Sequence, residues 1–119
     1  MRKKSTTIVF VFVALACVVK PAWAVTKLTP NEIKTIFANG KPFTSTSPGG
    51  AVFTIVLNPE GTATRAPQGS KNPTLGKWRL SDVGYCSTWG KGTENCYTIE
   101  KGATSFTVRD SAGKVAARW

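Results

Sequence analysis

The spacing of turn-forming residues between Trp78 and Trp119 is the feature that most constrains the fold of this chain. Four turn-forming stretches divide this segment into five runs in which apolar and polar residues alternate, which is the pattern of antiparallel strands joined by hairpins. The segment is therefore predicted to be a five-stranded antiparallel meander. The four stretches are Asp82-Val83, Gly90-Lys91-Gly92, Gly102-Ala103 and Asp110 to Gly113.

Each turn also predicts a pairing register between its two strands. Because side chains alternate between the two faces of a strand, a register assigns every residue to one face or the other. The four registers place Leu80 opposite Tyr85, Cys86 opposite Cys96, Ile99 opposite Phe106, and Val108 opposite Val115. They agree on one apolar face, which we expect to form the core from Trp78, Leu80, Tyr85, Tyr97, Ile99, Phe106, Val108, Val115 and Trp119.

A short helix is predicted ahead of the strands. Thr29 suits the N-cap, Pro30 suits the first helical position, and Glu32 completes a capping box. Asn39-Gly40 ends the helix. Its apolar stripe is expected to pack on the protein's own sheet rather than on a partner, and consists of Ile33, Ile36 and Phe37.

The region between the helix and the meander adds further strands. Ala51 to Leu57 is a nearly continuous β-favouring run, Asn58-Pro59-Glu60-Gly61 is a strong turn, and Pro67 to Pro73 is a looser loop. The sequence thus predicts a mainly β (α+β) fold. A short N-terminal helix packs on an antiparallel meander or on a small barrel of about seven strands.

The first 24 residues are predicted to be a signal peptide. A basic start, Arg2-Lys3-Lys4, precedes an apolar run from Ile8 to Val19, which is too short for a membrane span. Ala22-Trp23-Ala24 supplies a cleavage pattern, so residues 25–119 are expected to be a single small domain in the periplasm or the medium, with no transmembrane span. Lipid modification at Cys17 is the alternative, because the residues before it resemble a lipobox.

Cleavage after Ala24 would leave Cys86 and Cys96 as a pair in an oxidising compartment, and we expect them to form a structural disulfide. A redox role would favour a Cys-x-x-Cys spacing, whereas nine residues separate these two. The leader carries four of the sixteen cations. The mature chain therefore keeps twelve cations against six anions, and its net charge is +6 instead of +10.

Catalysis and cofactor binding have little support in the composition. The chain has no histidine, which removes Ser-His and Cys-His nucleophiles and the commonest ligand of transition metals. The six carboxylates include no closely spaced pair, although a glycosidase can draw its two carboxylates from distant strands. We therefore assign no catalytic residue, no metal ligand and no cofactor.

The other side of the meander is the candidate binding surface, and it holds five cations: Lys77, Arg79, Arg109, Lys114 and Arg118. Glu100 is its main opposing charge and is expected to pair with Arg118. Such a face would attract an anionic envelope glycan or lipid, nucleic acid or an acidic protein, although exposed cations also serve solubility alone. Trp89, beside the Gly-Lys-Gly turn, is the candidate for stacking on a ligand, with packing in the protein's own core as the alternative.

Through four motifs in the same order, the chain resembles a family of small, exported, uncharacterised proteobacterial proteins with a domain of unknown function. They are Asn39-Gly40-Lys41 at the end of the helix, Asn58-Pro59-Glu60-Gly61-Thr62, Gly76-Lys77-Trp78, and Tyr85-Cys86-Ser87-Thr88-Trp89 followed by Cys96-Tyr97. The resemblance implies an exported β-rich domain with a disulfide hairpin and no catalytic role. The chain departs from the pattern at Lys77, where a threonine would be expected.

These observations predict an exported, non-enzymatic binding module for an anionic envelope component or a protein partner. Two alternatives stay open: a small hydrolase that acts on an envelope polymer through carboxylates, and an inhibitor domain directed at an enzyme.

Overall fold

The computed structural model describes residues 25–119. The predicted signal peptide, its cleavage after Ala24 and the lipid on Cys17 lie outside the described residues. One helix, α1 (Pro30–Phe37), and nine strands form in the described part. The strands are β1 (Thr26–Lys27), β2 (Phe43–Thr46), β3 (Val52–Leu57), β4 (Thr62–Pro67), β5 (Thr74–Leu80), β6 (Tyr85–Trp89), β7 (Asn95–Lys101), β8 (Phe106–Asp110) and β9 (Val115–Arg118).

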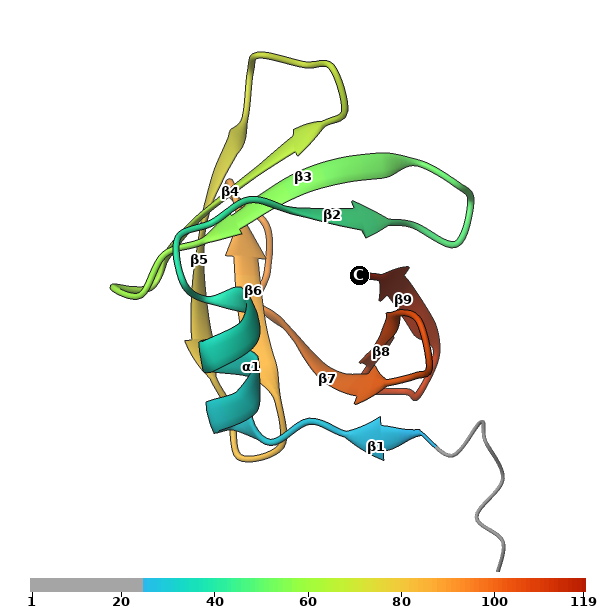
Figure 1. Cartoon of the computed structure of the whole chain (residues 1–119). Helices are drawn as coiled ribbons and strands as arrows, with labels where there is room; N and C mark the ends of the chain where they lie inside the picture. The colour runs from blue at the N-terminus through green and yellow to red at the C-terminus, as the bar shows by residue number, and fades with distance from the viewer. Residues whose placement is uncertain (1–24) are drawn as a thin grey trace, which may run out of the picture.

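Eight of these strands close into an antiparallel barrel (Figure 1). Each strand from β2 to β8 pairs with the next one along the chain, and β9 returns to β2 through the pair Thr46 and Arg118. The short β1 adds to the exposed end of β7, with Thr26 opposite Lys101. The mainly β fold with one short helix is therefore confirmed, and the barrel is the architecture that forms.

Two of the four predicted registers are confirmed and two are wrong. Leu80 lies opposite Tyr85 and Cys86 opposite Cys96, as expected. Between β7 and β8, however, Ile99 lies opposite Val108 instead of Phe106. The reason is the loop: four residues separate Lys101 from Phe106, where a two-residue turn was expected. A shift of two residues preserves the face of each side chain, so Ile99 and Val108 are both still buried.

A second correction concerns Val115, which was expected in the core. Val108 lies opposite Ala117, and a β-bulge between Val108 and Arg109 then places Val115 opposite Arg109. A bulge adds one residue to one strand and so changes which side chains face inward beyond it. Val115 is half-buried and lies outside the core cluster, while Ala117 packs against the core instead.

The helix forms with its predicted cap, and two of the three residues of its predicted apolar stripe are buried. The capping box of Thr29 and Glu32 is present, with backbone-to-side-chain hydrogen bonds of 3.0 and 3.3 Å. Ile33 and Phe37 are buried, but Ile36, which was expected in the same stripe, is 40% exposed. Successive residues of an α-helix are about 100° apart around its axis, so Ile36 and Phe37 point in different directions. The contact between the helix and the barrel covers Phe37 and leaves Ile36 partly in solvent.

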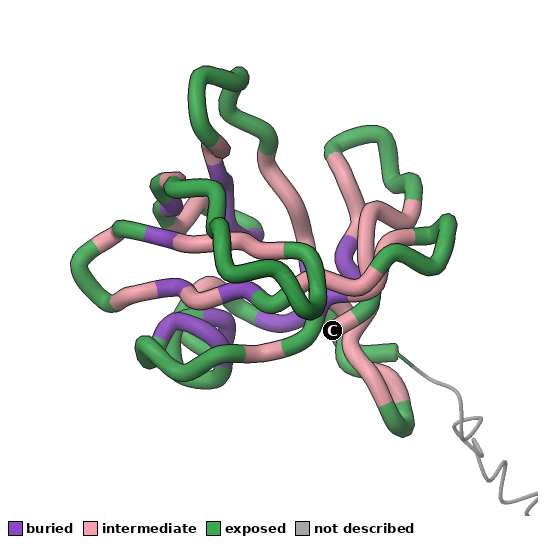
Figure 2. Tube along the Cα trace, turned by 90° about the horizontal axis from the view of Figure 1, so that it is seen from above, coloured by how far each residue is buried: buried purple, intermediate pink, exposed green. Residues whose placement is uncertain are grey.

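Burial follows the strands and the helix, whereas most exposed residues gather at the loops (Figure 2). Phe37 of α1 meets the rings of Phe106 and Trp119 edge-on, with centroids 4.9 and 4.8 Å away. The helix therefore packs against the strands that complete the barrel.

Within residues 25–119 no helix has the length and apolar character needed to cross a membrane.

The predicted disulfide is confirmed. Cys86 of β6 and Cys96 of β7 are bonded, with their Cα atoms 3.9 Å apart. Their neighbours Tyr85 and Tyr97 face the barrel interior, so the disulfide lies on the outward side of the same two strands.

Candidate functional site

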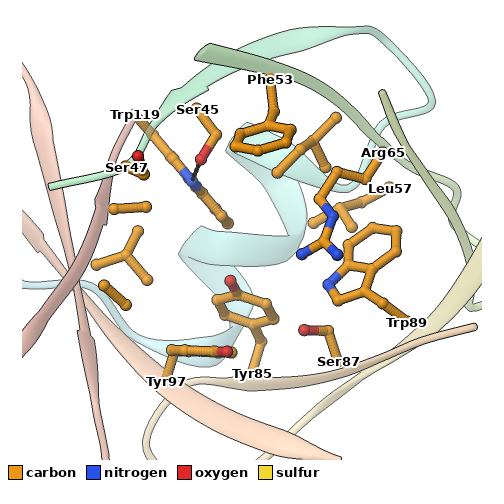
Figure 3. Close-up of a pocket in the computed structure, with 14 residues that line it drawn as sticks. Ser45, Ser47, Phe53, Leu57, Arg65, Tyr85, Ser87, Trp89, Tyr97 and Trp119 are labelled. Carbon is orange, nitrogen blue, oxygen red and sulfur yellow. Dashed lines mark hydrogen bonds between the residues drawn. The ribbon is translucent and has the colours of Figure 1, made fainter. Parts of the chain in front are cut away.

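A cavity of about 170 Å³ lies inside the barrel, with α1 behind it in the view of Figure 3. Its wall combines aromatic rings, aliphatic groups, hydroxyls and a single charged side chain. The rings belong to Phe53, Tyr85, Trp89, Tyr97 and Trp119; the aliphatic groups to Ile55, Leu57, Val108, Ala116 and Ala117; the aliphatic hydroxyls to Ser45, Ser47 and Ser87; and the charge to Arg65.

The hairpin of β3 and β4 explains why a charged residue faces this interior. Phe53, Ile55 and Leu57 alternate along β3 and all line the cavity. In the register of the hairpin, Ala63 lies opposite Leu57 and Arg65 lies opposite Ile55. Because directly opposed residues share a face, Arg65 is directed inward like the buried Ala63.

The Arg65 guanidinium is held by two rings. Its Cζ atom lies 4.7 Å from the centroid of the Trp89 ring and 5.8 Å from that of Phe53. A guanidinium over an aromatic face is stabilised by the negative potential of the ring. In Figure 3 its nitrogen atoms point toward the centre of the cavity rather than toward the wall.

No carboxylate in the described part of the chain neutralises Arg65. The two ion pairs found among residues 25–119 join Arg79 to Glu94 and Arg109 to Glu100. None of the six acidic side chains lines the cavity. The cavity therefore has a net positive charge that comes from one side chain.

Gly76 makes room for the ring that supports this charge. It lies opposite Trp89 in the pairing of β5 and β6. A Cβ atom at Gly76 would come within 2.5 Å of Cε3 of Trp89 and of the backbone oxygen of Thr88. Only glycine leaves the space that the Trp89 ring occupies.

Two buried hydroxyls face the same cavity. Tyr85 and Ser87 are only 5% and 3% exposed, and neither hydroxyl is hydrogen-bonded to another residue of the described part. In that part every side-chain nitrogen or oxygen atom that is sealed from solvent has a hydrogen-bond partner. These two hydroxyls are consequently reached from the cavity and are free to bind what enters it.

Burial raises the pKa of Tyr85 far above the ordinary value of a phenol. The neighbouring Tyr97, whose ring is stacked on that of Tyr85 at 5.3 Å, also has a raised pKa because it is partly buried. Both side chains therefore keep their protons at neutral pH, and each can donate a hydrogen bond.

The five cations of the predicted outer face do not meet on one surface. Lys77 and Arg79 belong to β5, whereas Arg109, Lys114 and Arg118 belong to β8, to β9 or to the loop between them. In the closed barrel β6 and β7 separate β5 from β8, and Figure 1 shows β5 and β8 on different sides. A flat meander would have placed these side chains together, but the curved wall spreads them around the barrel.

Two of these five cations are also neutralised. Arg79 makes a bidentate contact with Glu94, at 3.0 Å from Nε and 2.6 Å from Nη2. Nε of Arg109 lies 3.1 Å from Oε1 of Glu100, so Glu100 pairs with Arg109 and not with Arg118 as the sequence suggested. The Arg79 guanidinium lowers the pKa of Glu94, which keeps that pair ionised at neutral pH.

Other groups that could react are already committed to structural contacts. The side chains of Cys86, Cys96 and Glu94 come within 4.8 Å of one another, but both sulfurs belong to the disulfide and offer no thiolate to a metal. Glu32 belongs to the helix cap, and Asp110 accepts backbone hydrogen bonds from Ala112 and Lys114 in its turn.

Trp89 is the candidate residue that the structure places at the cavity. Arg65, Phe53, Tyr85 and Ser87 were not identified as site residues from the sequence. The signal for Arg65 was present, because the turn Asn58-Pro59-Glu60-Gly61 sets a register that places Arg65 opposite an inward Ile55.

The chain matches no protein-family model, no curated protein and no solved structure. Its resemblance to the proteobacterial family accordingly stays a prediction.

Proposed function

We propose that this protein is an exported, non-enzymatic binding module whose barrel cavity takes up a small organic anion. The observation that supports this proposal is Arg65, a guanidinium directed into the cavity with aromatic rings around it and no carboxylate partner among residues 25–119.

The physical argument is electrostatic. Arg65 is half-buried, and a charge that loses part of its hydration costs free energy unless an opposite charge or hydrogen bonds compensate it. An anion in the cavity would compensate Arg65 in surroundings of lower polarity than water, where the attraction is stronger. The planar guanidinium also offers a pair of parallel donors that suits an oxyanion.

The outer wall offers less to an anion than the cavity does. Its cations are spread around the barrel, and two of the five predicted ones already have acidic partners. This geometry favours a small ligand inside the barrel over a long polyanion on the surface. A carboxylate hydrolase also has little support, since no acidic side chain lines the cavity.

Export is part of the same proposal. The Cys86–Cys96 disulfide fits an oxidising compartment, and the first 24 residues have the pattern of a cleaved leader. A binding module in the periplasm or the medium would meet small acids before the cell takes them up or after it releases them.

The test is the thermal unfolding of the mature protein with a panel of small carboxylates, sulfonates and phosphates, each beside a neutral compound of similar shape. A ligand that binds only the native state raises its stability by roughly 2.7 kcal/mol at a hundred times Kd. We expect stabilisation by at least one anion, its loss in Arg65→Gln, and its retention in Arg118→Gln, which removes the same charge from the exposed outer wall.

Equal loss of stabilisation in the two variants would show that net charge alone attracts the anion, and the cavity proposal would then be wrong. Heparin binding that depends steeply on salt and is lost in a variant with Arg109→Glu and Lys114→Glu would instead favour the outer wall.

A further inference from the structure

The wall of the cavity combines two kinds of chemistry. Arg65, Tyr85 and Ser87 bring a cation and two hydroxyls toward its centre, as Figure 3 shows. Ile55, Leu57 and Val108 contribute only aliphatic surface. A ligand that fills this space needs a polar end and an apolar body.

The polar groups of the wall fit a single negative charge. Arg65 is the one charged residue in the wall that the described part of the chain forms. A dianion would carry a second charge for which the wall offers no cation, so that charge is partly desolvated without a partner, and this costs free energy. A carboxylate presents one charge and two oxygens, which matches one bidentate guanidinium.

The volume of the cavity and its apolar groups fit one ring. A protein cavity of about 150 Å³ is known to hold a benzene molecule, and the cavity here measures about 170 Å³. Its wall includes the stacked rings of Tyr85 and Tyr97, which present flat surfaces. Aromatic pairs gain from offset or edge-to-face contact beyond the burial of area, so a flat body suits this wall better than a branched chain.

We propose that the ligand is a monocarboxylate whose body is a single aromatic ring, an acid of the size of benzoate. This inference rests on the proposed function and specifies the ligand of the same site. Arg65 holds the carboxylate with two hydrogen bonds, while Phe53 and Trp89 keep the guanidinium in place. The hydroxyls of Ser87 and Tyr85 donate to the same carboxylate, and the ring lies against the aliphatic and aromatic side chains of the wall.

The role of Tyr85 agrees with its surroundings. The residue is only 5% exposed, and its hydroxyl has no hydrogen-bond partner in the described residues and faces the cavity. Burial keeps it protonated across the neutral range, so it can donate to a carboxylate but offers no negative charge that would repel one.

The experiment is isothermal titration calorimetry of the mature, oxidised protein with four probes at neutral pH and low salt. Benzoate has the ring and one charge, benzyl alcohol has the ring without charge, acetate has the charge without a ring, and phenyl phosphate has the ring with a higher charge. We expect benzoate to bind about tenfold or more tightly than each of the other three, since a hydrogen-bonded charge pair and the burial of a ring are each large enough for that ratio.

Three variants test the residue roles. Arg65→Gln should weaken benzoate binding about tenfold or more and should leave benzyl alcohol unchanged. Ser87→Ala should weaken benzoate less than Arg65→Gln does, and the exposed Arg118→Gln should behave as the wild type. Thermal unfolding of each variant without ligand shows whether it is folded. If Arg65→Gln does not fold, weaker benzoate binding by Ser87→Ala still tests whether the carboxylate binds in the cavity.

The outcomes separate this inference from the proposed function. Tighter binding of phenyl phosphate or equal binding of acetate, when abolished by Arg65→Gln, would overturn the ring monocarboxylate and leave the anion-binding cavity in place. Equal binding of benzyl alcohol and benzoate, with no effect of Arg65→Gln, would overturn both.

Discussion

The indole Nε1 of Trp119 donates a hydrogen bond of 3.0 Å to Oγ of Ser45, a residue 74 positions earlier in the chain. The bond crosses the seam at which β9 meets β2, where a single residue pair, Thr46 and Arg118, is in register. The Trp119 ring also packs on Phe43 of β2, with centroids 4.6 Å apart. Side-chain contacts of Trp119 thus supplement a short backbone seam.

Loss of the Ser45 hydroxyl should destabilise the barrel. Ser45→Ala leaves the part-buried Trp119 Nε1 without an acceptor, and an unsatisfied donor of this kind costs roughly 1–3 kcal/mol. Chemical denaturation measures the free energy of unfolding, and Thr44→Ala, at the exposed neighbouring position, is the control. If the two variants were equally stable, the bond would contribute nothing to closure.

The disulfide should stabilise the native fold without being needed to form it. Replacing both Cys86 and Cys96 with serine should lower the free energy of unfolding by about 2–3 kcal/mol, because the short loop they close loses its constraint in the unfolded chain. Circular dichroism should keep its β signature. Two titratable thiols in the native, unreduced wild type would contradict the pairing.

Gly76 should be required for the position of the Trp89 ring. In Gly76→Ala the new methyl group meets Trp89 and the Thr88 backbone, and overpacking of this kind costs about 1–3 kcal/mol. The indole resonance of Trp89 should shift in NMR spectra, and affinity for the anion should fall. Gly49→Ala is the matched control, since a Cβ atom there would meet nothing within 4 Å. An unmoved Trp89 resonance would show that the backbone adjusts instead.

Because of the capping box, the free energy of unfolding should depend on pH in the acid range. Hydrogen bonds from the Thr29 backbone and side chain lower the pKa of Glu32 below its ordinary 4.5. A carboxylate with a lowered folded-state pKa stabilises the protein above its unfolded pKa, and this contribution is lost as the pH falls through the folded value.

Glu32→Gln, which keeps a hydrogen-bonding side chain, should therefore be less stable than the wild type at pH 7 and equally stable well below pH 4.5. Unfolding measured as a function of pH checks this, with Lys34→Gln, which removes one charge from the same helix, as the control. If the free energies of unfolding of Glu32→Gln and the wild type differed by the same amount across the acid range, ionisation of Glu32 would not contribute to stability.

Processing of the leader is a prediction from the sequence alone. Expression of the full chain in a Gram-negative host should yield a protein that begins at Val25, because Ala22-Trp23-Ala24 has the small-x-small pattern that signal peptidase cleaves. Intact-mass spectrometry decides the point. A diacylglycerol adduct on Cys17 would show that the lipobox is used instead.

Local chemistry was readable from the sequence wherever the contacting residues are close along the chain. The cap of α1 and the registers around Tyr85 and Cys86 follow from turns and caps a few residues long, and the structure contains them. The loop after Lys101 was misread because glycine permits more than one turn length there.

The cavity and its ligand chemistry depended on contacts between distant segments. Closure of β9 onto β2 curves the sheet, spreads the outer cations around the wall and brings Tyr85 and Trp119 to the same interior as Arg65 and Trp89. Alternation within the sequence assigns each side chain to a face. Only the closed barrel turns one of those faces into a common interior, because a face becomes an interior when its edges are joined by hydrogen bonds.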